Sequence, residues 1–165
     1  MIKEVLIGLN ALIKQRGSIL NCVEEIYLSR QNLTTDEDVI LFVNKVREIV
    51  QREAVEAVIN NGGRGLVVMA TGSGKSKVAV DLAKYYNKVG KHFDGHCLVV
   101  PTEKLRDENW DEEFIKWKAT KVSDNTEKIC YASASKLEDF NFNLAILDEV
   151  HNITELSAQL FSNNH

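Results

Sequence analysis

The chain has 165 residues, of which 44% are apolar, and a formal net charge of -4. This length suffices for one domain with a hydrophobic core, and the apolar fraction is ordinary for a globular protein. The acidic balance excludes attraction to nucleic acid by bulk charge, so such a contact would need a local groove of hydroxyls, backbone amides and a few bases. No apolar run in the sequence approaches the roughly 18 residues of a membrane-spanning helix.

The first part of the chain, residues 1–33, is predicted to be a helical segment. Its two short helices are expected at 2–16 and 19–28, separated by Gly17 and Ser18. A longer helix is predicted to begin at Thr34/Thr35 and to run to Asn60, because Thr34 and Glu37 have the spacing of a capping box. Residues 34–165 otherwise alternate strand-like and helical patterns, which implies an α/β fold with a parallel sheet.

A glycine-bracketed loop stands near the middle of the chain, where residues 66–77 read LVVMATGSGKSK. The apolar run 66–69 predicts a short buried strand, and Val78 and Leu82 repeat at helical spacing after the loop. Glycines in such a loop adopt positive φ and turn consecutive N–H groups inward around a phosphate, at the positive end of the following helix. The sequence therefore predicts a site for a nucleoside triphosphate. Its expected contacts are Thr71, Gly72, Ser73, Gly74, Lys75 and Ser76.

Two residues of this loop have distinct predicted roles. Lys75 would reach the β- and γ-phosphates as a point charge, and the Ser76 hydroxyl would ligate Mg²⁺. Met69 stands where the strict phosphate-loop pattern has a glycine. The alternative is a glycine-rich turn between a strand and a helix that binds nothing. The order of strand, loop and helix favours the phosphate-binding interpretation.

A second candidate site follows the apolar run 144–147, which predicts another buried strand. Asp148 and Glu149 come directly after it, and ligands of parallel sheets bind at the carboxyl ends of the strands. An aspartate there can hold Mg²⁺ through water, and a neighbouring glutamate can orient or deprotonate the water that attacks the γ-phosphate. The alternative is a pair of solvated acids at a strand end.

These two segments, MATGSGKS and LDEVH, resemble motifs I and II of superfamily 2 helicases and translocases of the DExH group. Three further stretches are similar to other motifs of the family, and the resemblance extends from about Arg47 to the end of the sequence. They are Gln51 in IVQREAVEAV, the motif Ia-like VVPTEKL at 99–105 and the motif Ib-like ICYAS at 129–133. Within the superfamily the motif sequences are most similar to those of the type I/III restriction-subunit and phage helicase branch.

The resemblance implies a RecA-like ATP-binding domain that uses ATP and Mg²⁺ and acts on DNA, or alternatively on RNA. By the same resemblance, the Gln51 amide would read the adenine edge, and His151 would couple the nucleotide state to domain closure. The catalytic set it implies is Lys75, Asp148, Glu149 and His151. Contacts with the nucleic-acid backbone are implied for Pro101, Thr102, Lys104 and Arg106.

Two parts of the family pattern do not occur in these residues: the motif III strand, which in the family lies between the strands ending at Met69 and Leu147, and the second RecA-like domain with its arginine finger. The resemblance therefore implies a partial domain that hydrolyses ATP weakly, with a second chain or a downstream segment supplying the rest. Two other functions stay open, a non-catalytic ATP-binding or interaction module and a P-loop ATPase that acts on protein.

The remaining chemistry-bearing residues favour structural interpretations. Cys22, Cys97 and Cys130 are scattered and unpaired, which is typical of a reduced cytoplasmic setting. The resemblance implies that this is the cytoplasm of a bacterial or phage-infected cell. His92 and His96 lie in a loop-like context that argues against a metal site. The aromatic residues Trp110, Phe114 and Trp117 have the spacing of a buried helix face, although base stacking is the alternative.

Overall fold

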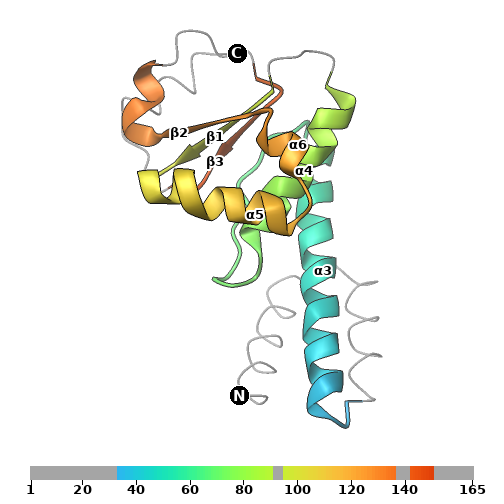
Figure 1. Ribbon diagram of the computed structural model, residues 1–165. Helices are drawn as coiled ribbons and strands as arrows, with labels where there is room; N and C mark the ends of the chain where they lie inside the picture. Colours follow the sequence, from blue (N-terminus) through green and yellow to red (C-terminus); the bar gives the residue numbers. More distant parts are fainter. Residues whose placement is uncertain (1–32, 91–94, 137–141, 151–165) are drawn as a thin grey trace. The chain divides into compact units, whose positions relative to one another are not determined.

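A computed structural model describes residues 33–90, 95–136 and 142–150 of the chain (Figure 1). The chain divides into two compact units, residues 1–54 and 55–165, and each unit is described by itself. The two short helices predicted within 1–33 lie outside the described residues. The predicted domain boundary at 33/34 also stays a prediction.

Helix α3, Asp36–Asn60, begins with a capping box that differs from the predicted one. The Asp38 N–H donates to the Thr35 hydroxyl at 3.1 Å, and the Asp38 carboxylate accepts the Thr35 N–H at 2.9 Å. The predicted pair of Thr34 and Glu37 was therefore wrong by one residue, because an aspartate at 38 reaches back to both threonines. These hydrogen bonds lower the pKa of Asp38 to about 2. Phe42 and Ile49 form a small apolar cluster on this helix.

The second unit is an α/β layer whose elements follow α3 in the order α4, β1, η1, α5, α6, β2, η2 and β3. Gly62 and Gly63, with φ of 69° and 83°, end α3 as predicted. The bounds are α4 Lys75–Val89, β1 His96–Val100, η1 Leu105–Asn109 (a π-helical turn), α5 Trp110–Lys116, α6 Thr120–Ser123, β2 Thr126–Cys130, η2 Tyr131–Lys136 (a 3₁₀ helix) and β3 Leu144–Leu147.

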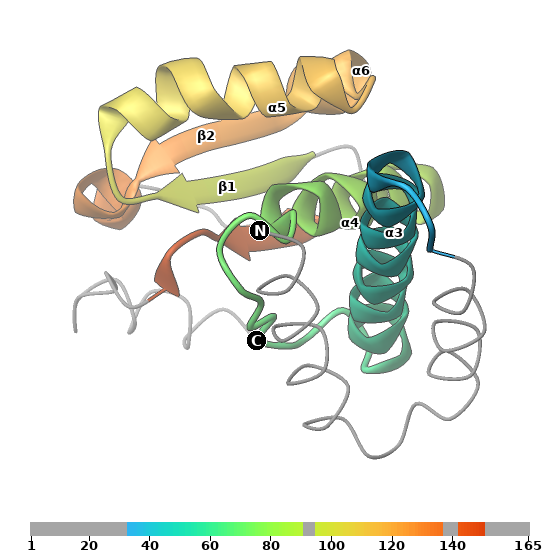
Figure 2. The same cartoon turned by 90° about the horizontal axis from the view of Figure 1, so that it is seen from below.

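The three strands form one parallel sheet in the order β2-β1-β3, which confirms the predicted fold class. Val99 of β1 pairs with Ile129 of β2 on one side and with Leu147 of β3 on the other. The crossover η1–α5–α6 lies along one face of β1 and β2 (Figure 2). Because all three strands run in the same direction, their carboxyl ends lie together at one end of the sheet, the edge at which the strands finish.

The core of this unit lies around the central strand β1, whose five residues are all buried. Cys97 and Val99 pack with Tyr131 on one face, and α5 contributes the buried rings of Trp110 and Phe114. Burial confirms the prediction that these two aromatic residues belong to the core, whereas Trp117 is only half-buried. Burial also raises the pKa of Cys97 to about 12, so its thiol behaves as a small apolar group.

The strand predicted at 66–69 is absent from the sheet, and that prediction was wrong. Leu66 and Val68 are 71% and 76% exposed, and no regular element includes residues 64–70. A strand needs a hydrogen-bonded neighbour, and within the described residues β3 is paired only with β1. The apolar composition of 66–69 therefore indicates a tendency to form a strand, but no described strand is hydrogen-bonded to these residues.

His96, the first residue of β1, is fully buried, and neither of its ring nitrogens has a hydrogen-bond partner among the described residues. Burial lowers the pKa of this imidazole below its usual 6.5, and the neighbouring Ala83 backbone offsets only part of that shift. A neutral buried histidine adds no charge interaction to the folded state. At low pH the unfolded chain binds a proton at this residue and the folded chain does not, which favours unfolding.

We therefore expect the free energy of unfolding to be insensitive to His96 above pH 6.5 and to fall as the pH drops below that value. The slope contributed by one group is at most about 1.4 kcal/mol per pH unit. Urea unfolding at a series of pH values measures it, with His96→Leu as the comparison because leucine cannot titrate. Parallel pH profiles for the two proteins would contradict the assignment.

Among the described residues, no helix is long and apolar enough to cross a membrane.

Candidate nucleotide-binding site

The loop before α4 has the backbone of an anion cradle. Gly72 and Gly74 have φ of 76° and 91°, the left-handed conformation that the sequence analysis expects of them. Gly74 is the N-cap of α4, and no side chain caps this helix end. A Cβ placed at Gly72 would meet nothing within 4 Å, so this side of the loop faces open space. An uncapped helix N-terminus that opens on free space is suited to a phosphate.

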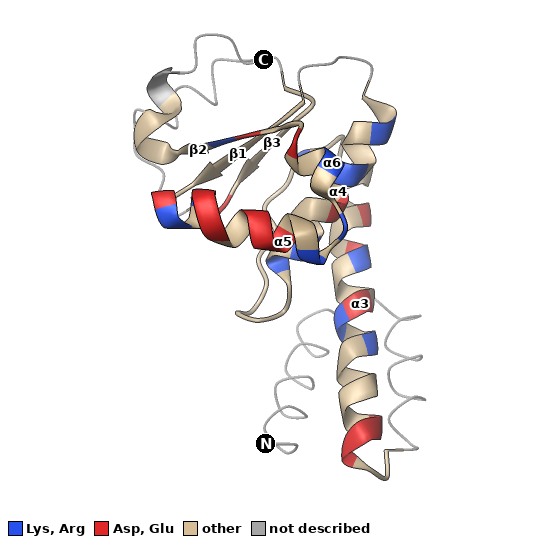
Figure 3. Ribbon diagram, viewed as in Figure 1, with Lys and Arg blue, Asp and Glu red and all other residues tan. Residues whose placement is uncertain are grey.

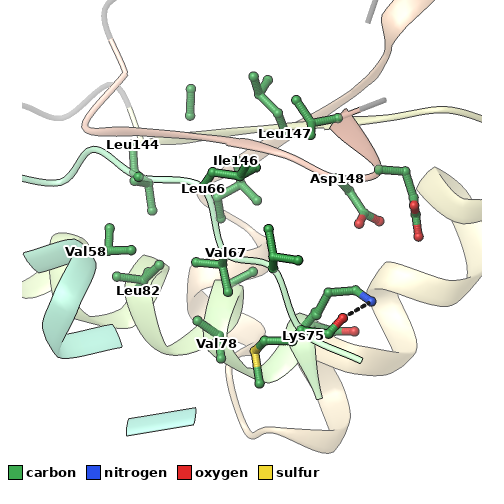
Figure 4. Close-up of a pocket in the computed structure, with 18 of the residues that line it drawn as sticks. Val58, Leu66, Val67, Lys75, Val78, Leu82, Leu144, Ile146, Leu147 and Asp148 are labelled. Carbon is green, nitrogen blue, oxygen red and sulfur yellow. Dashed lines mark hydrogen bonds between the residues drawn. The ribbon is translucent and has the colours of Figure 1, made fainter. Parts of the chain in front are cut away.

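Lys75 and Met69 are joined within this loop. The Lys75 Nζ donates to the Met69 carbonyl oxygen at 3.3 Å, and the lysine side chain is half-buried (Figure 4). The loop is also closed by the Ser73 N–H, which donates to the Ala70 carbonyl at 3.2 Å. Since residue 69 contributes its backbone carbonyl to Lys75, a methionine can serve there in place of the glycine of the strict pattern.

Asp148 is fixed from three directions at the carboxyl end of β3. Its N–H donates to the Val99 carbonyl at 2.9 Å, and its own carbonyl accepts the Tyr131 hydroxyl at 2.9 Å. Its Oδ2 accepts the indole N–H of Trp110 at 3.1 Å. Burial raises the pKa of the Asp148 carboxyl and the charge of Glu149 adds to the shift, while the Trp110 hydrogen bond opposes it. The Tyr131 hydroxyl stays protonated, because burial raises its pKa to about 12.

Glu149 follows in a left-handed conformation with φ of 52°, which is uncommon for a residue that is not glycine. Its side chain is exposed, whereas that of Asp148 is half-buried. The two neighbouring carboxylates therefore have different environments. Asp148 suits the role of a fixed metal ligand, and Glu149 suits the role of a group in contact with water.

One cavity of about 530 Å³ brings the two predicted segments together. Lys75 and Ser76 line it from the start of α4, and Asp148 and Glu149 line it from the end of β3. Figure 4 shows Lys75 and Asp148 at one end of this cavity, while Val58, Leu82 and Leu144 lie at the other. The cavity is thus polar where the two segments meet and apolar along the side of β3.

The other predicted site residues are not all brought to this cavity. Gln51 is buried but belongs to the other compact unit, so its relation to the loop stays a prediction. His151 lies outside the described residues. Thr71, Gly72, Ser73 and Gly74 form the loop without lining the cavity, and Pro101, Thr102, Lys104 and Arg106 follow β1 at the same sheet edge.

Mg²⁺ fits the donor chemistry of this cavity. A hydroxyl from Ser76 and a carboxylate from Asp148 are hard oxygen donors, and Mg²⁺ sites are commonly completed by water and by the oxygens of a phosphate ligand. The described residues contain no cluster of three or more His, Cys, Asp or Glu side chains suited to a metal. The fit is therefore to a metal that arrives with a nucleotide, rather than to an ion held by protein alone.

Sequence reasoning missed the contacts that Trp110 and Tyr131 make with Asp148. The periodicity of the aromatic residues predicts that Trp110 is buried, but it carries no information about the partner of the indole N–H. That partner is 38 positions away along the chain and is reached only through the fold. A buried tryptophan N–H needs an acceptor, and this requirement is the only signal in the sequence that such a contact exists.

The parallel sheet, the glycine loop at the start of α4 and the acidic pair at the end of β3 define a nucleotide-binding domain of the RecA-like class, present here in part. The model of the family described as "Type III restriction enzyme, res subunit" matches residues 44–164, well over half of the chain. The chain belongs to this family, an N-terminal domain of superfamily 2 helicases. No curated protein and no solved structure shows significant similarity to it.

Proposed function

We propose that this chain is the ATP-binding portion of a nucleic-acid-dependent ATPase, a helicase or translocase that couples ATP hydrolysis to movement on DNA. The observation that carries the proposal is the shared cavity, in which Lys75 and Ser76 meet Asp148 and Glu149. Two segments far apart in the sequence converge there with complementary chemistry: a cation and an open helix N-terminus for phosphate, and two carboxylates for metal and water. The family membership supports ATP and Mg²⁺ as the ligands.

Each side chain has a role that follows from its chemistry. Lys75 would leave the Met69 carbonyl and donate to phosphate oxygens, which are stronger acceptors for a cation than a neutral carbonyl. Ser76 and Asp148 would hold the Mg²⁺ that supplies charge neutralisation at the phosphates. Glu149, whose side chain is exposed, would accept a hydrogen bond from water and orient it for attack. Gln51 and His151 keep the adenine-reading and coupling roles that the resemblance implies.

Nucleic-acid contact would be made where β1 ends, by Pro101, Thr102 and Lys104 more than by Arg106. The Arg106 guanidinium is already engaged by Asp107, with Nε to Oδ1 at 2.6 Å and Nη2 to Oδ2 at 2.9 Å. Figure 3 shows that acidic residues follow one another along η1 and α5. Their negative charge repels phosphate. The contact would therefore be confined to the sheet edge, with the exposed Lys104 as its main cation.

We expect Lys104→Ala to weaken the binding of single-stranded DNA regardless of its sequence, because a lysine that contacts phosphate acts by charge alone. The slope of log K against log salt should become less steep by about 0.7, the contribution of one phosphate contact on a single strand. Fluorescence anisotropy of a labelled oligonucleotide at several salt concentrations measures both changes. Lys121→Ala, on the exposed surface of α6, is the matched control and should leave the slope unchanged.

Turnover separates the proposal from its main alternative, an ATP-binding module without catalysis. We would measure phosphate release with and without single-stranded DNA or RNA, on the same preparation used for binding. Stimulation by DNA supports the proposed coupling, and stimulation by RNA alone would replace DNA as the substrate. Binding of ATP with no stimulation by either would favour the alternative.

A further inference from the structure

Asp148 is held by hydrogen bonds from three different elements of the fold. Val99, Tyr131 and Trp110 hold its N–H, its carbonyl and its Oδ2, and they come from β1, η2 and α5 respectively. The first two bonds fix the backbone, whereas the Trp110 bond holds the carboxylate itself, which also accepts a hydrogen bond from the Glu149 backbone. Trp110 is 5% exposed and lines the same cavity as Lys75 and Ser76.

We propose that Trp110 is a positioning residue for the metal-binding carboxylate, its indole N–H holding Asp148 Oδ2 so that the carboxylate is preset to receive Mg²⁺ with the nucleotide. This inference rests on the proposed function of the cavity. An indole N–H is a donor only, so Trp110 can orient the carboxylate without competing with it for the metal. A carboxylate has about four lone-pair sites, so one indole bond leaves it free to accept further partners.

Simple satisfaction of a buried N–H does not account for the choice of partner. Trp117 shows the ordinary solution, because its indole N–H donates at 2.8 Å to Glu113, one turn earlier in the same helical stretch. Trp110 instead bonds a carboxylate from a different strand, in a half-buried position where a charge is costly. The structure therefore links α5 to the candidate metal site through a single hydrogen bond.

The local helix geometry places the Trp110 indole beside Asp148. The π-helical turn η1 immediately precedes it, and the Trp110 N–H bonds the Leu105 carbonyl across this turn. A π turn accommodates one extra residue, which rotates all following positions by about 100° around the helix axis. That rotation carries the indole inward, together with Phe114 one turn later, whose ring centroid lies 6.0 Å away. Lys104, the proposed nucleic-acid contact, is the N-cap of the same turn.

The test compares Trp110→Phe with Trp117→Phe, because each variant keeps an aromatic ring and loses one indole N–H bond to a carboxylate. We would titrate Mg²⁺ into each protein with a fluorescent ATP analogue and follow nucleotide binding, after circular dichroism has checked that the variants are folded. Loss of a group that orients a metal ligand typically costs about 10–100-fold in metal affinity. We expect that loss for Trp110→Phe and none for Trp117→Phe, while nucleotide binding without Mg²⁺ stays equal in both.

A spectroscopic signal adds a readout that a purely structural role would not give. In Trp117→Phe the only tryptophan left is Trp110, so its emission should change when Mg²⁺ joins a bound nucleotide. Equal Mg²⁺ dependence in the two variants, or an emission that ignores Mg²⁺, would overturn the positioning role while leaving the proposed function intact. Absence of nucleotide binding in the unaltered chain would overturn both.

Discussion

Replacing Lys75 by alanine should abolish measurable binding of ATP and ADP. Two cations line the cavity, Arg64 and Lys75, and Figure 4 shows Lys75 at the end where Asp148 lies. A hydrogen bond that involves a charged group contributes about 1.5–3 kcal/mol, and a lysine at two phosphates makes more than one. Since each 1.4 kcal/mol changes Kd tenfold, we expect Kd to rise by about 100-fold or more. Isothermal titration calorimetry with Mg²⁺ measures it.

Lys77 provides a matched control for this experiment. It lies on the same helix, but its ammonium pairs with Asp81 one turn later. Lys77→Ala removes the same charge from the same helix and should leave Kd within about twofold, because that charge is already paired with Asp81 and its longer-range effects are screened by salt. Equal affinity of the Lys75→Ala protein and the unaltered chain would reject the loop as the phosphate site.

The elements that could be predicted from the sequence are those whose signal is local. The glycine loop, the helix at 75–89 and the strand at 144–147 each carry their own periodicity or turn chemistry, and all three occur in the structure. The candidate site is also largely predictable, because a phosphate loop and a strand-end acidic pair are short motifs that a parallel sheet brings to one edge.

The features that escaped prediction depend on partners far away in the chain. Residues 66–69 have the composition of a strand, but a strand exists only where another offers its edge, and composition does not reveal that. The Trp110–Asp148 bond likewise joins two elements whose proximity only the fold creates. The capping box moved from Thr34 to Thr35 because two adjacent threonines compete for one cap.

The outer edge of β3, the side that faces away from β1, carries backbone groups without a strand partner among the described residues. The Asp148 N–H donates to the carbonyl of Val99, and Val99 is paired with Leu147 in the sheet. Successive residues of a strand direct their N–H and C=O groups to alternate sides, so the even-numbered residues of β3 direct theirs toward β1. Ala145 and Leu147 therefore direct their N–H and C=O groups to the opposite side, where the described residues form no strand. The extended residues 66–69 stand across the cavity from this edge, with Leu66 and Val68 exposed.

An open parallel edge beside exposed apolar residues recruits other strands. We therefore expect the purified chain to self-associate at micromolar concentration, unless another polypeptide segment fills the gap beside β3. Sedimentation velocity at several concentrations measures the association. Ala145→Lys puts a charge at the open edge and should weaken the association at least about tenfold, or about 1.4 kcal/mol. Ala57→Lys, at an exposed position of α3, is the control for added charge and should not.

Hydrogen exchange examines the same edge one amide at a time. In the dilute monomer the Ile146 N–H, which faces β1, should exchange slowly, while those of its neighbours Ala145 and Leu147 should exchange fast. On association the two fast amides should become protected, because an added strand would bond them and remove the cost of about 1–3 kcal/mol for each buried, unpaired group. A monomer in which all three amides are equally protected would mean that β3 already has a second neighbour, and the open-edge interpretation would fall with it.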